Sequence, residues 1–308
     1  MEHSYFEIDV HALTHKGREK EINEDQFIVA ELNTSMFINE TSLNLPQGSP
    51  WIGPRQGKLF VVADGLGGHP GGAEASTVAI DTLIDYLSDT MPWLLSLNAN
   101  NRANIKDELE RAMRRCESRI KQAADKNPEH KGMGTTLTLA YVLWPKLFVV
   151  HVGNSSAYLL RQGVLDKVTH DHTMAKKLVK EGRVEKSTVE SSAWTSILWN
   201  VVGGFEESLL APEVFEATLQ DGDLLLLCTN GLNKVLSDEI LKEKLKAPKR
   251  AHQLCFELIS EAVAKENPDD VTAIVARFTH KEESGTIPKV DAENVTVLQG
   301  APLKANAS

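Results

Sequence analysis

The chain has 308 residues, of which 42% are hydrophobic and 25% charged, so its composition excludes a wholly disordered or low-complexity protein. Its 33 basic and 43 acidic residues give a formal net charge of -10, and this overall field repels phosphate backbones and anionic membrane surfaces. The three cysteines, Cys116, Cys228 and Cys255, show no C-x-x-C spacing, which argues against a zinc knot or a disulfide framework and favours a reducing compartment.

No part of the sequence resembles a membrane span or a targeting signal. Residues 1–25 are charged and lack an apolar segment, and no run of about 18 uninterrupted apolar residues occurs. We therefore expect a cytoplasmic protein, a monomer, that binds neither a membrane nor nucleic acid.

Apolar runs and apolar stripes predict strands and helices from residue 59 onward. The predicted strands are Leu59–Ala63, Thr136–Leu143, Leu147–Val152, Ala157–Arg161, Glu213–Thr218, Leu224–Thr229 and Val271–Phe278. Apolar residues at helical spacing predict two long helices, on Ala75, Ala79, Leu83 and Leu87 and on Ile105, Leu109, Met113, Cys116 and Ile120. A second helical pair is predicted at Asp238–Leu245 and on Leu254, Leu258, Ile259, Ala262 and Val263.

These elements occur in blocks of strands and blocks of helices, which favours a layered α+β fold over a doubly wound one. The polar, Pro- and Gly-rich residues 33–57 predict a long surface loop or an extended hairpin. Residues 172–204 begin like a helix and become irregular, which suggests a flap-like segment beside a site. The polar residues 281–308 lack periodicity, and we expect a disordered tail there.

At five places in the sequence an acidic residue or Asn stands beside Gly or a second acid, and four of these places adjoin a predicted strand. These positions are Asn23-Glu24-Asp25, Asp64-Gly65, Gly153-Asn154-Ser155, Asn230-Gly231 and Asp269-Asp270. Mg²⁺ and Mn²⁺ prefer oxygen ligands, and strand ends can bring several such ligands together. A single Asp-Gly is ordinarily a turn, but the repeated pattern predicts a divalent-metal site.

The most informative segment is the glycine-rich stretch VVADGLGGHPGGAEAS, which leaves a predicted strand and enters a predicted helix. It contains neither the Gly-Lys-Ser/Thr of a phosphate-binding loop nor the G-x-G-x-x-G spacing of a dinucleotide site. Both of those nucleotide-binding classes are therefore disfavoured.

The chain resembles the PPM (PP2C-type) metal-dependent protein serine/threonine phosphatases, especially the bacterial branch. The motifs that carry the resemblance are, in order, Gly17-x-x-Lys20-x-x-Asn23-Glu24-Asp25, Val62-Ala63-Asp64-Gly65-Leu66-Gly67-Gly68-His69, Gly132-Met133-Gly134-Thr135-Thr136, His151-Val152-Gly153-Asn154-Ser155, Thr169-x-Asp171-His172, Cys228-Thr229-Asn230-Gly231-Leu232 and Asp269-Asp270-Val271-Thr272. The resemblance implies a phosphatase domain over residues 1–280. Its expected fold is a four-layer α-β-β-α sandwich, with two central antiparallel β-sheets flanked by helix pairs.

The resemblance also implies two Mg²⁺ or Mn²⁺ ions and a role for each matched residue. Asp64 matches the carboxylate that bridges both ions, and Gly65 matches a backbone carbonyl ligand. Glu24 matches a ligand of one ion, Asp269 a ligand of the other, and Asp25 the acid that holds a metal-bound water. The implied reaction is hydrolysis of phosphoserine or phosphothreonine in proteins by a metal-activated water.

Three residues depart from the family pattern at positions that matter. Asn230 replaces an Asp that binds the same ion as Asp269, and Asn154 replaces an Asp of a third, weaker metal site. Lys20 replaces the Arg that binds the substrate phosphate, which keeps the charge but loses the bidentate geometry. A unit charge ~4 Å from another is worth about 4 kcal/mol at an effective dielectric constant of 20, so Asn230 weakens its metal site. Asp270, where the family commonly has Asn, is expected to restore part of that charge if its side chain faces the site.

Three functions therefore remain open. The chain is a phosphatase with weakened metal binding, or a catalytically impaired pseudophosphatase that binds a partner or phosphopeptide, or an acidic divalent-ion-binding structural domain without phosphate recognition. The ordered motifs disfavour the third. His69 is a weaker candidate for a general acid. In the family, the histidine that acts as the general acid occupies the position of Leu66, and a structural role in the turn is the simpler interpretation of His69. The expected partner is a phosphoprotein substrate or a phosphopeptide.

Overall fold

The computed structural model describes residues 5–37, 50–66, 71–96, 102–189, 192–204 and 210–281. The strands are β1 Tyr5–His15, β2 Asp25–Phe37, β3 Pro50–Asp64, β4 Gly134–Thr135, β5 Leu137–Leu143, β6 Lys146–Val152, β7 Ser156–Arg161, β8 Val164–Lys167, β9 Val202–Gly203, β10 Glu213–Thr218, β11 Leu224–Cys228 and β12 Val271–Lys281. The α-helices are α1 Gly72–Ser96, α2 Arg102–Ala124, α3 Met174–Lys180, α4 Lys186–Val189, α5 Asn230–Asn233, α6 Asp238–Leu245 and α7 Ala251–Ala264.

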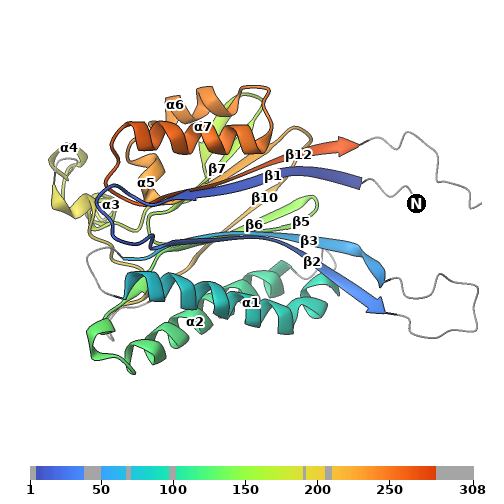
Figure 1. Ribbon diagram of the computed structural model, residues 1–308, viewed down its shortest axis with the longest axis horizontal. Helices are drawn as coiled ribbons and strands as arrows, with labels where there is room; N and C mark the ends of the chain where they lie inside the picture. The colour runs from blue at the N-terminus through green and yellow to red at the C-terminus, as the bar shows by residue number, and fades with distance from the viewer. Residues whose placement is uncertain are drawn as a thin grey trace, which may run out of the picture.

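Two five-stranded sheets lie face to face at the centre of the molecule (Figure 1). One has the strand order β1-β12-β11-β7-β8 and the other the order β10-β6-β5-β3-β2, and the neighbouring strands pair antiparallel. Helices α1 and α2 cover the outer face of the second sheet, while α6 and α7 cover the outer face of the first. The predicted four-layer α-β-β-α sandwich is confirmed.

The alternation of side chains along β3 explains how one strand serves two hydrophobic layers. Phe60 and Val62 point into the layer between the two sheets, where they join Phe278 of β12. Leu59 and Val61 point to the other face, where they pack with the residues of α1 and α2. Successive residues of a strand face opposite sides, and because both sides here are covered by protein, an almost continuous apolar run is required.

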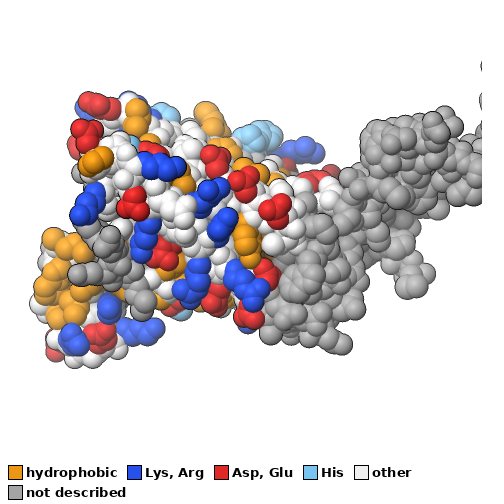
Figure 2. Space-filling model, turned by 90° about the horizontal axis from the view of Figure 1, so that it is seen from below, with side chains coloured by type: hydrophobic (Ala, Val, Ile, Leu, Met, Phe, Trp, Pro, Cys, Tyr) orange, Lys and Arg blue, Asp and Glu red, His pale blue; other side chains and the backbone are white. Residues whose placement is uncertain are grey.

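Helices α1 and α2 bury one stripe each and leave the rest of their surface to water. Leu83 of α1 and Leu109 of α2 are among the buried residues of the layer that faces β3. On the opposite side of this layer, basic and acidic side chains alternate over the exposed surface (Figure 2). Such an amphipathic pattern fixes which face of each helix turns toward the sheet.

A separate apolar layer joins α6 and α7 to the first sheet. Leu254 and Leu258 of α7 pack with Leu226 of β11 in this layer. The Ser237 hydroxyl accepts a hydrogen bond from the backbone N–H of Ile240 and caps the start of α6. This layer supports β11 and β12 from behind.

The structure describes only part of the two regions that were predicted to be irregular, residues 33–57 and 281–308. Residues 33–57 belong largely to the β2–β3 hairpin, as the extended-hairpin alternative predicted, and residues 38–49 lie outside the described part of the chain. The final strand β12 continues to Lys281, and the predicted tail beyond it also lies outside the described residues. Among the described helices, none is both long and apolar enough to cross a membrane.

The sandwich brings several strand ends to one edge, the left-hand end in Figure 1. β3 ends at Asp64, which pairs across the sheet with Asp25, the first residue of β2. β12 begins just after Asp269 and Asp270, and the antiparallel neighbour β11 ends there, just before Asn230. Segments that are more than 200 residues apart in sequence therefore meet at this edge.

Candidate functional site

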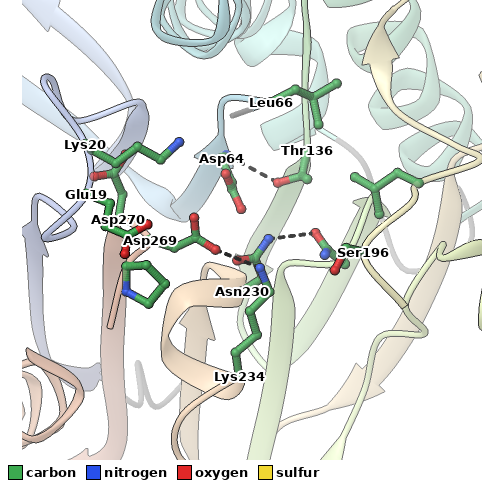
Figure 3. A pocket seen from close by; sticks show the side chains of 13 residues that line it. Glu19, Lys20, Asp64, Leu66, Thr136, Ser196, Asn230, Lys234, Asp269 and Asp270 are labelled. Atoms are coloured by element: carbon green, nitrogen blue, oxygen red, sulfur yellow. Dashed lines mark hydrogen bonds and ion pairs between the residues drawn. The ribbon is translucent and has the colours of Figure 1, made fainter. Parts of the chain in front are cut away.

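A polar pocket of about 390 Å³ opens at the edge where the strand ends meet. Figure 3 shows its side chains pointing into a common space from several loops and strand ends. The lining residues are Glu19, Lys20, Asp64, Leu66, Thr136, Asn154, Ser196, Leu198, Asn230, Lys234, Pro268, Asp269 and Asp270. Of the predicted site residues, the pocket thus brings together Lys20, Asp64, Asn154, Asn230 and Asp269.

Asp64 and Asp25 form an acidic pair that bridges β2 and β3. Because the two residues are direct cross-strand partners, their carboxylates occupy neighbouring positions at the sheet edge. Burial raises the pKa of Asp64 well above its usual range, and the nearby charge of Asp25 raises it further, against the opposing effect of Lys234. Burial also raises the pKa of Asp25, although hydrogen bonds from two threonines oppose the rise. Two neighbouring carboxylates with so little access to water cannot both ionise at low cost unless a cation lies between them.

Asp25 lies beneath the pocket and ties three strands together. Its Oδ2 accepts hydrogen bonds from the hydroxyls of Thr229, at 2.8 Å, and Thr272, at 2.7 Å. Its Oδ1 is also buried, but it has no hydrogen-bond partner within the described ranges. An orphaned carboxylate oxygen beside a second buried acid is suited to a positive ion or to an ordered water.

Glu24 and Lys20 form an ion pair, and Lys20 lines the pocket. The Lys20 ammonium donates to Glu24 Oε2, and both side chains are largely buried. Burial would lower the pKa of Lys20, but the bond and charge of Glu24 outweigh burial and raise it. Gly65, directly after Asp64, donates its backbone N–H to the Glu24 carbonyl at 3.2 Å, so the predicted carbonyl ligand lies beside Glu24.

Asp270 binds the backbone of the first loop, which consists of the residues between β1 and β2. Its Oδ1 accepts the backbone N–H of Gly17 and its Oδ2 that of Glu24, both at 2.8 Å. Both oxygens are therefore engaged in holding the loop that presents Lys20 and Glu24. Asp270 also lines the pocket, so its expected compensation for the missing charge of Asn230 stays a prediction.

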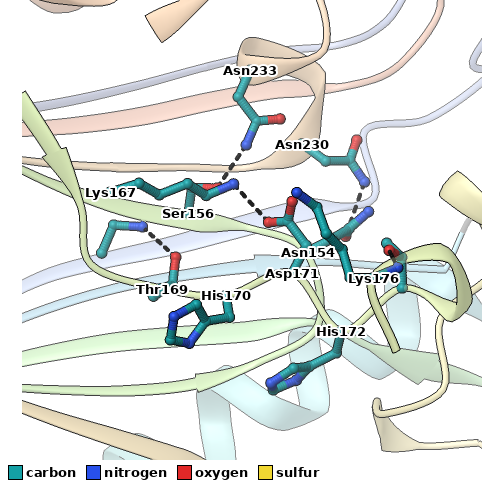
Figure 4. A network of polar contacts seen from close by, with 12 residues as sticks. Asn154, Ser156, Lys167, Thr169, His170, Asp171, His172, Lys176, Asn230 and Asn233 are labelled. Atoms are coloured by element: carbon teal, nitrogen blue, oxygen red, sulfur yellow. Dashed lines mark hydrogen bonds and ion pairs between the residues drawn. The ribbon is translucent and has the colours of Figure 1, made fainter. Parts of the chain in front are cut away.

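Asn230 and Asn154 bind each other across the pocket. The Asn230 amide Nδ2 donates to Asn154 Oδ1 at 3.2 Å (Figure 4). Asn230 begins α5, and the next residue, Gly231, lies so close to Asp270 that a Cβ would stand 2.0 Å from the Asp270 carbonyl oxygen. Only glycine permits this approach, which keeps Asn230 beside Asp269.

The loop that carries Asn154 is also fastened from its other side. Gly153 has a φ of 111°, and its backbone N–H donates to His172 Nδ1 at 3.1 Å. The same ring nitrogen receives the Asn200 amide at 2.9 Å. Figure 4 shows His172, at the start of the 172–204 segment, beneath the strand end that presents Asn154.

Lys234 is the pocket residue that the sequence analysis missed. It follows α5, four residues after Asn230, and its ammonium bonds to Asp269 Oδ2 at 2.7 Å. An i, i+4 relation to Asn230 on a helical turn was the available signal, because it places Lys234 on the same side. Glu19, Thr136, Ser196 and Leu198 were also overlooked as pocket residues.

The pocket residues fit a divalent cation unequally in its two halves. Within the described ranges, no three Asp, Glu, His or Cys side chains already stand close enough together to hold a metal ion. Glu24 and Asp269 are each turned onto a lysine instead. The Asp25–Asp64 pair, with the unpaired oxygen of Asp25, still fits a cation. Asp269 is paired with a lysine, and its neighbour Asn230 adds no charge. His69 lies outside the described residues.

The sequence matches the family model of protein phosphatase 2C over residues 48–274. This match covers well over half of the chain, which therefore belongs to the protein phosphatase 2C family. The matched range includes Asp64, Asn154, Asn230 and Asp269, and the first loop with Glu24 precedes it.

Among similar proteins, the serine/threonine protein phosphatase PstP of Mycobacterium tuberculosis is 33% identical over 256 residues, which are 81% of this chain and 47% of PstP. The chain thus spans about half the length of that relative. The serine/threonine phosphatase stp of Listeria monocytogenes is 28% identical over 70% of this chain and 83% of its own. A solved structure of the PstP catalytic domain, in complex with two manganese ions, matches 89% of this chain and 100% of that domain, with 28% identity and a TM-score of 0.67.

Proposed function

We propose that the protein hydrolyses phosphoserine and phosphothreonine in proteins, in a reaction that depends on Mn²⁺ or Mg²⁺. The observation that carries the proposal is the acidic pair of Asp64, which lines a polar pocket, and its buried cross-strand partner Asp25, in a member of the protein phosphatase 2C family. The two manganese ions of the PstP catalytic domain support two ions here.

In this proposal Glu24, Asp64 and Gly65 would hold one ion, and Asp64, Asp269 and Asn230 would hold the other. Asn154 is the residue available to a third and weaker site. When bound, the divalent ions supply positive charge that acidifies water and neutralises the phosphoryl oxygens.

The protein's own residues orient the reactants. Asp25 is held rigidly through Oδ2, which leaves Oδ1 to accept a proton from the attacking water. Lys20 binds the substrate phosphate after its ammonium moves from Glu24, and it does so as a point charge. No nucleophilic side chain is needed, and the raised pKa that burial gives to the thiols of Cys116, Cys228 and Cys255 makes each a poor nucleophile.

The alternative is a catalytically impaired pseudophosphatase that binds a partner or a phosphopeptide. The hydrogen bond between the Asn230 and Asn154 side chains favours it, because two neutral amides stand where the family pattern has two carboxylates. We keep it as the second candidate function.

A phosphatase assay with Mn²⁺ and a phosphothreonine peptide separates the two candidates. If the enzyme proposal is right, the parent protein releases phosphate, Asp64→Asn abolishes the release, and Asn230→Asp increases it. No release from the parent, with recovery in Asn230→Asp, would remove the enzyme proposal and leave the pseudophosphatase. The matched control is Asn127→Asp, which adds the same charge outside the pocket lining, at the N-cap of the short 3-10 helix Pro128–His130, where Asp can also cap.

Further parts of the proposal concern the rest of the chain. We assign residues 1–280 to one phosphatase domain in which the 172–204 segment is a flap beside the pocket, supported by Ser196 and Leu198 in its lining. We expect a cytoplasmic monomer acting on phosphoproteins, and the three free, buried cysteines agree with a reducing compartment. His69 remains a weaker candidate for a general acid, and an unchanged rate in His69→Ala would remove it.

A further inference from the structure

Lys234 lies in the pocket where the second divalent ion of the proposed function is expected. Its ammonium donates to Asp269 Oδ2 at 2.7 Å, and its charge acts on Asp64. The lysine is 43% exposed, so the fold does not depend on burying it. Figure 3 shows Lys234 and Asp269 converging from α5 and from the start of β12.

The two halves of the pocket differ in the charge they offer a dication. Asp64 is shared by the two halves. In the half with Glu24, Lys20 binds Glu24, and the carboxylate of Asp25 adds a further negative charge beside Asp64. In the other half, the Lys234 ammonium neutralises Asp269, and the neighbouring Asn230 adds no charge. Each half therefore contains one lysine, but Asp25 adds a carboxylate to the first half, whereas Asn230 adds none to the second.

We propose that Lys234 competes with the second divalent ion for Asp269 and thereby makes the two metal sites unequal in affinity. This inference rests on the proposed metal-dependent function and deepens it by naming the residue that sets the metal requirement. An ion that binds at Asp269 first displaces the ammonium and then remains close to its positive charge. Both costs weaken the second site without affecting the first to the same degree.

The same geometry predicts that Asn230 and Lys234 act together. A carboxylate at position 230 would stand one helical turn before Lys234, at a spacing that favours an acid–lysine pair. The ammonium would then neutralise the introduced carboxylate. Restoring the acid alone therefore gains less metal affinity than restoring it after Lys234 has been removed.

Calorimetric titration of the full chain with Mn²⁺ tests this inference without requiring turnover. The parent should bind one ion tightly and a second at least about tenfold more weakly, and Lys234→Met should tighten the second site about tenfold, because it removes one positive charge at close range. Lys234→Arg keeps the charge and should behave like the parent. Lys242→Met removes the same charge from α6, outside the pocket lining, and should also leave both affinities unchanged.

The double variant Asn230→Asp/Lys234→Met provides the second measurement. We expect the second site to tighten by more than the product of the two single effects, which is the coupling that competition requires. Two equally tight sites in the parent, or an unchanged second site in Lys234→Met, would overturn the inference while leaving the proposed function intact. Absence of Mn²⁺ binding in all variants would overturn both together.

Discussion

The carboxylate of Asp270 receives backbone N–H donors from Gly17 and Glu24, and thereby holds the first loop against the start of β12. A charged acceptor is strong in this role, and both of its oxygens are required. Its neighbour Asp269 also lines the pocket, but its side chain binds Lys234 there and not the first loop. The two adjacent acids before β12 thus bind different partners, because their side chains point in different directions.

Replacing Asp270 should destabilise the protein. Asp270→Asn puts an NH₂ group where one backbone N–H now finds an acceptor, and we expect a loss of about 1.5–3 kcal/mol in the free energy of unfolding. Urea unfolding measures this loss. The exposed Asp125→Asn, at the end of α2, is the control and should change stability by less than about 0.5 kcal/mol. Equal stability of the two variants would contradict the loop-holding role.

His151 is buried as a neutral ring, and this makes stability depend on pH. Its Nδ1 bonds to the Thr138 hydroxyl at 2.8 Å and its Nε2 donates to the carbonyls of Gly153 and His170, both at 3.0 Å. Burial lowers the pKa of His151 to about 3, from the 6.5 of a free histidine. The unfolded chain therefore binds one more proton than the native protein between these two values.

As the pH falls from 6.5 towards 4, His151 should lower the free energy of unfolding by up to about 1.4 kcal/mol per pH unit. Above pH 6.5 the ring is neutral in both states and its contribution is constant. His151→Asn should remove this part of the slope, measured by urea unfolding between pH 4 and 6.5. The exposed His252→Asn is the control, and an identical slope in His151→Asn would contradict the assignment.

At the scale of elements, helix α7 illustrates how one apolar stripe holds a layer in place. Leu258 is fully buried against the first sheet, whereas Phe256, two residues earlier on the same helix, is 66% exposed. Residues two apart on a helix point in different directions. The two side chains therefore allow a comparison of a buried and an exposed position on the same helix.

Leu258→Ala should lower the free energy of unfolding by about 2–5 kcal/mol, because it leaves a cavity between α7 and the sheet. Phe256→Ala should cost less than about 1 kcal/mol although it removes more atoms, since that ring is mostly in water. Thermal or urea unfolding of both variants provides the comparison. A larger loss in Phe256→Ala would mean that the helix packs through its other face.

The central elements could be predicted from the sequence because their hydrophobic signal is strong. Strand β10 and helix α6 have the predicted bounds, and the apolar runs that form β5, β6 and β11 are buried on both faces.

Strand β1 was not predicted, because the charged residues Glu7 and Asp9 alternate with its apolar residues and weaken the hydrophobic pattern. Strand β2 was missed for a similar reason, since much of it is only half buried. Pairing with β12 and β3 compensates for these weak local patterns.

In the molecule as a whole, the pocket forms because strand ends that are far apart in sequence meet at one edge of the sandwich. The acids at strand boundaries could be predicted from the sequence, because hard cations require oxygen ligands and strands end where such residues collect. The direction of each side chain could not. Asp270 turned to the backbone and Lys234 entered the pocket through contacts between residues that are distant in sequence.

Metal binding should stabilise the whole molecule. An ion that binds only the folded state at 100 times its dissociation constant adds about 2.7 kcal/mol to the free energy of unfolding. We expect Mn²⁺ to raise the melting temperature of the full chain, a chelator to reverse the rise, and Asp64→Asn to abolish it. A chain that melts at the same temperature with and without Mn²⁺ would contradict a metal site at the sheet edge. The chain with Asp125→Asn is the control and should keep the full shift.

The most direct measurement is anomalous X-ray scattering from crystals grown with Mn²⁺, which locates manganese independently of activity. The account predicts a strong anomalous peak in coordinating contact with Asp64 and Glu24, and a weaker peak beside Asp269 that strengthens in Lys234→Met. Manganese bound only elsewhere on the surface, with no peak in contact with Asp64, would contradict the account.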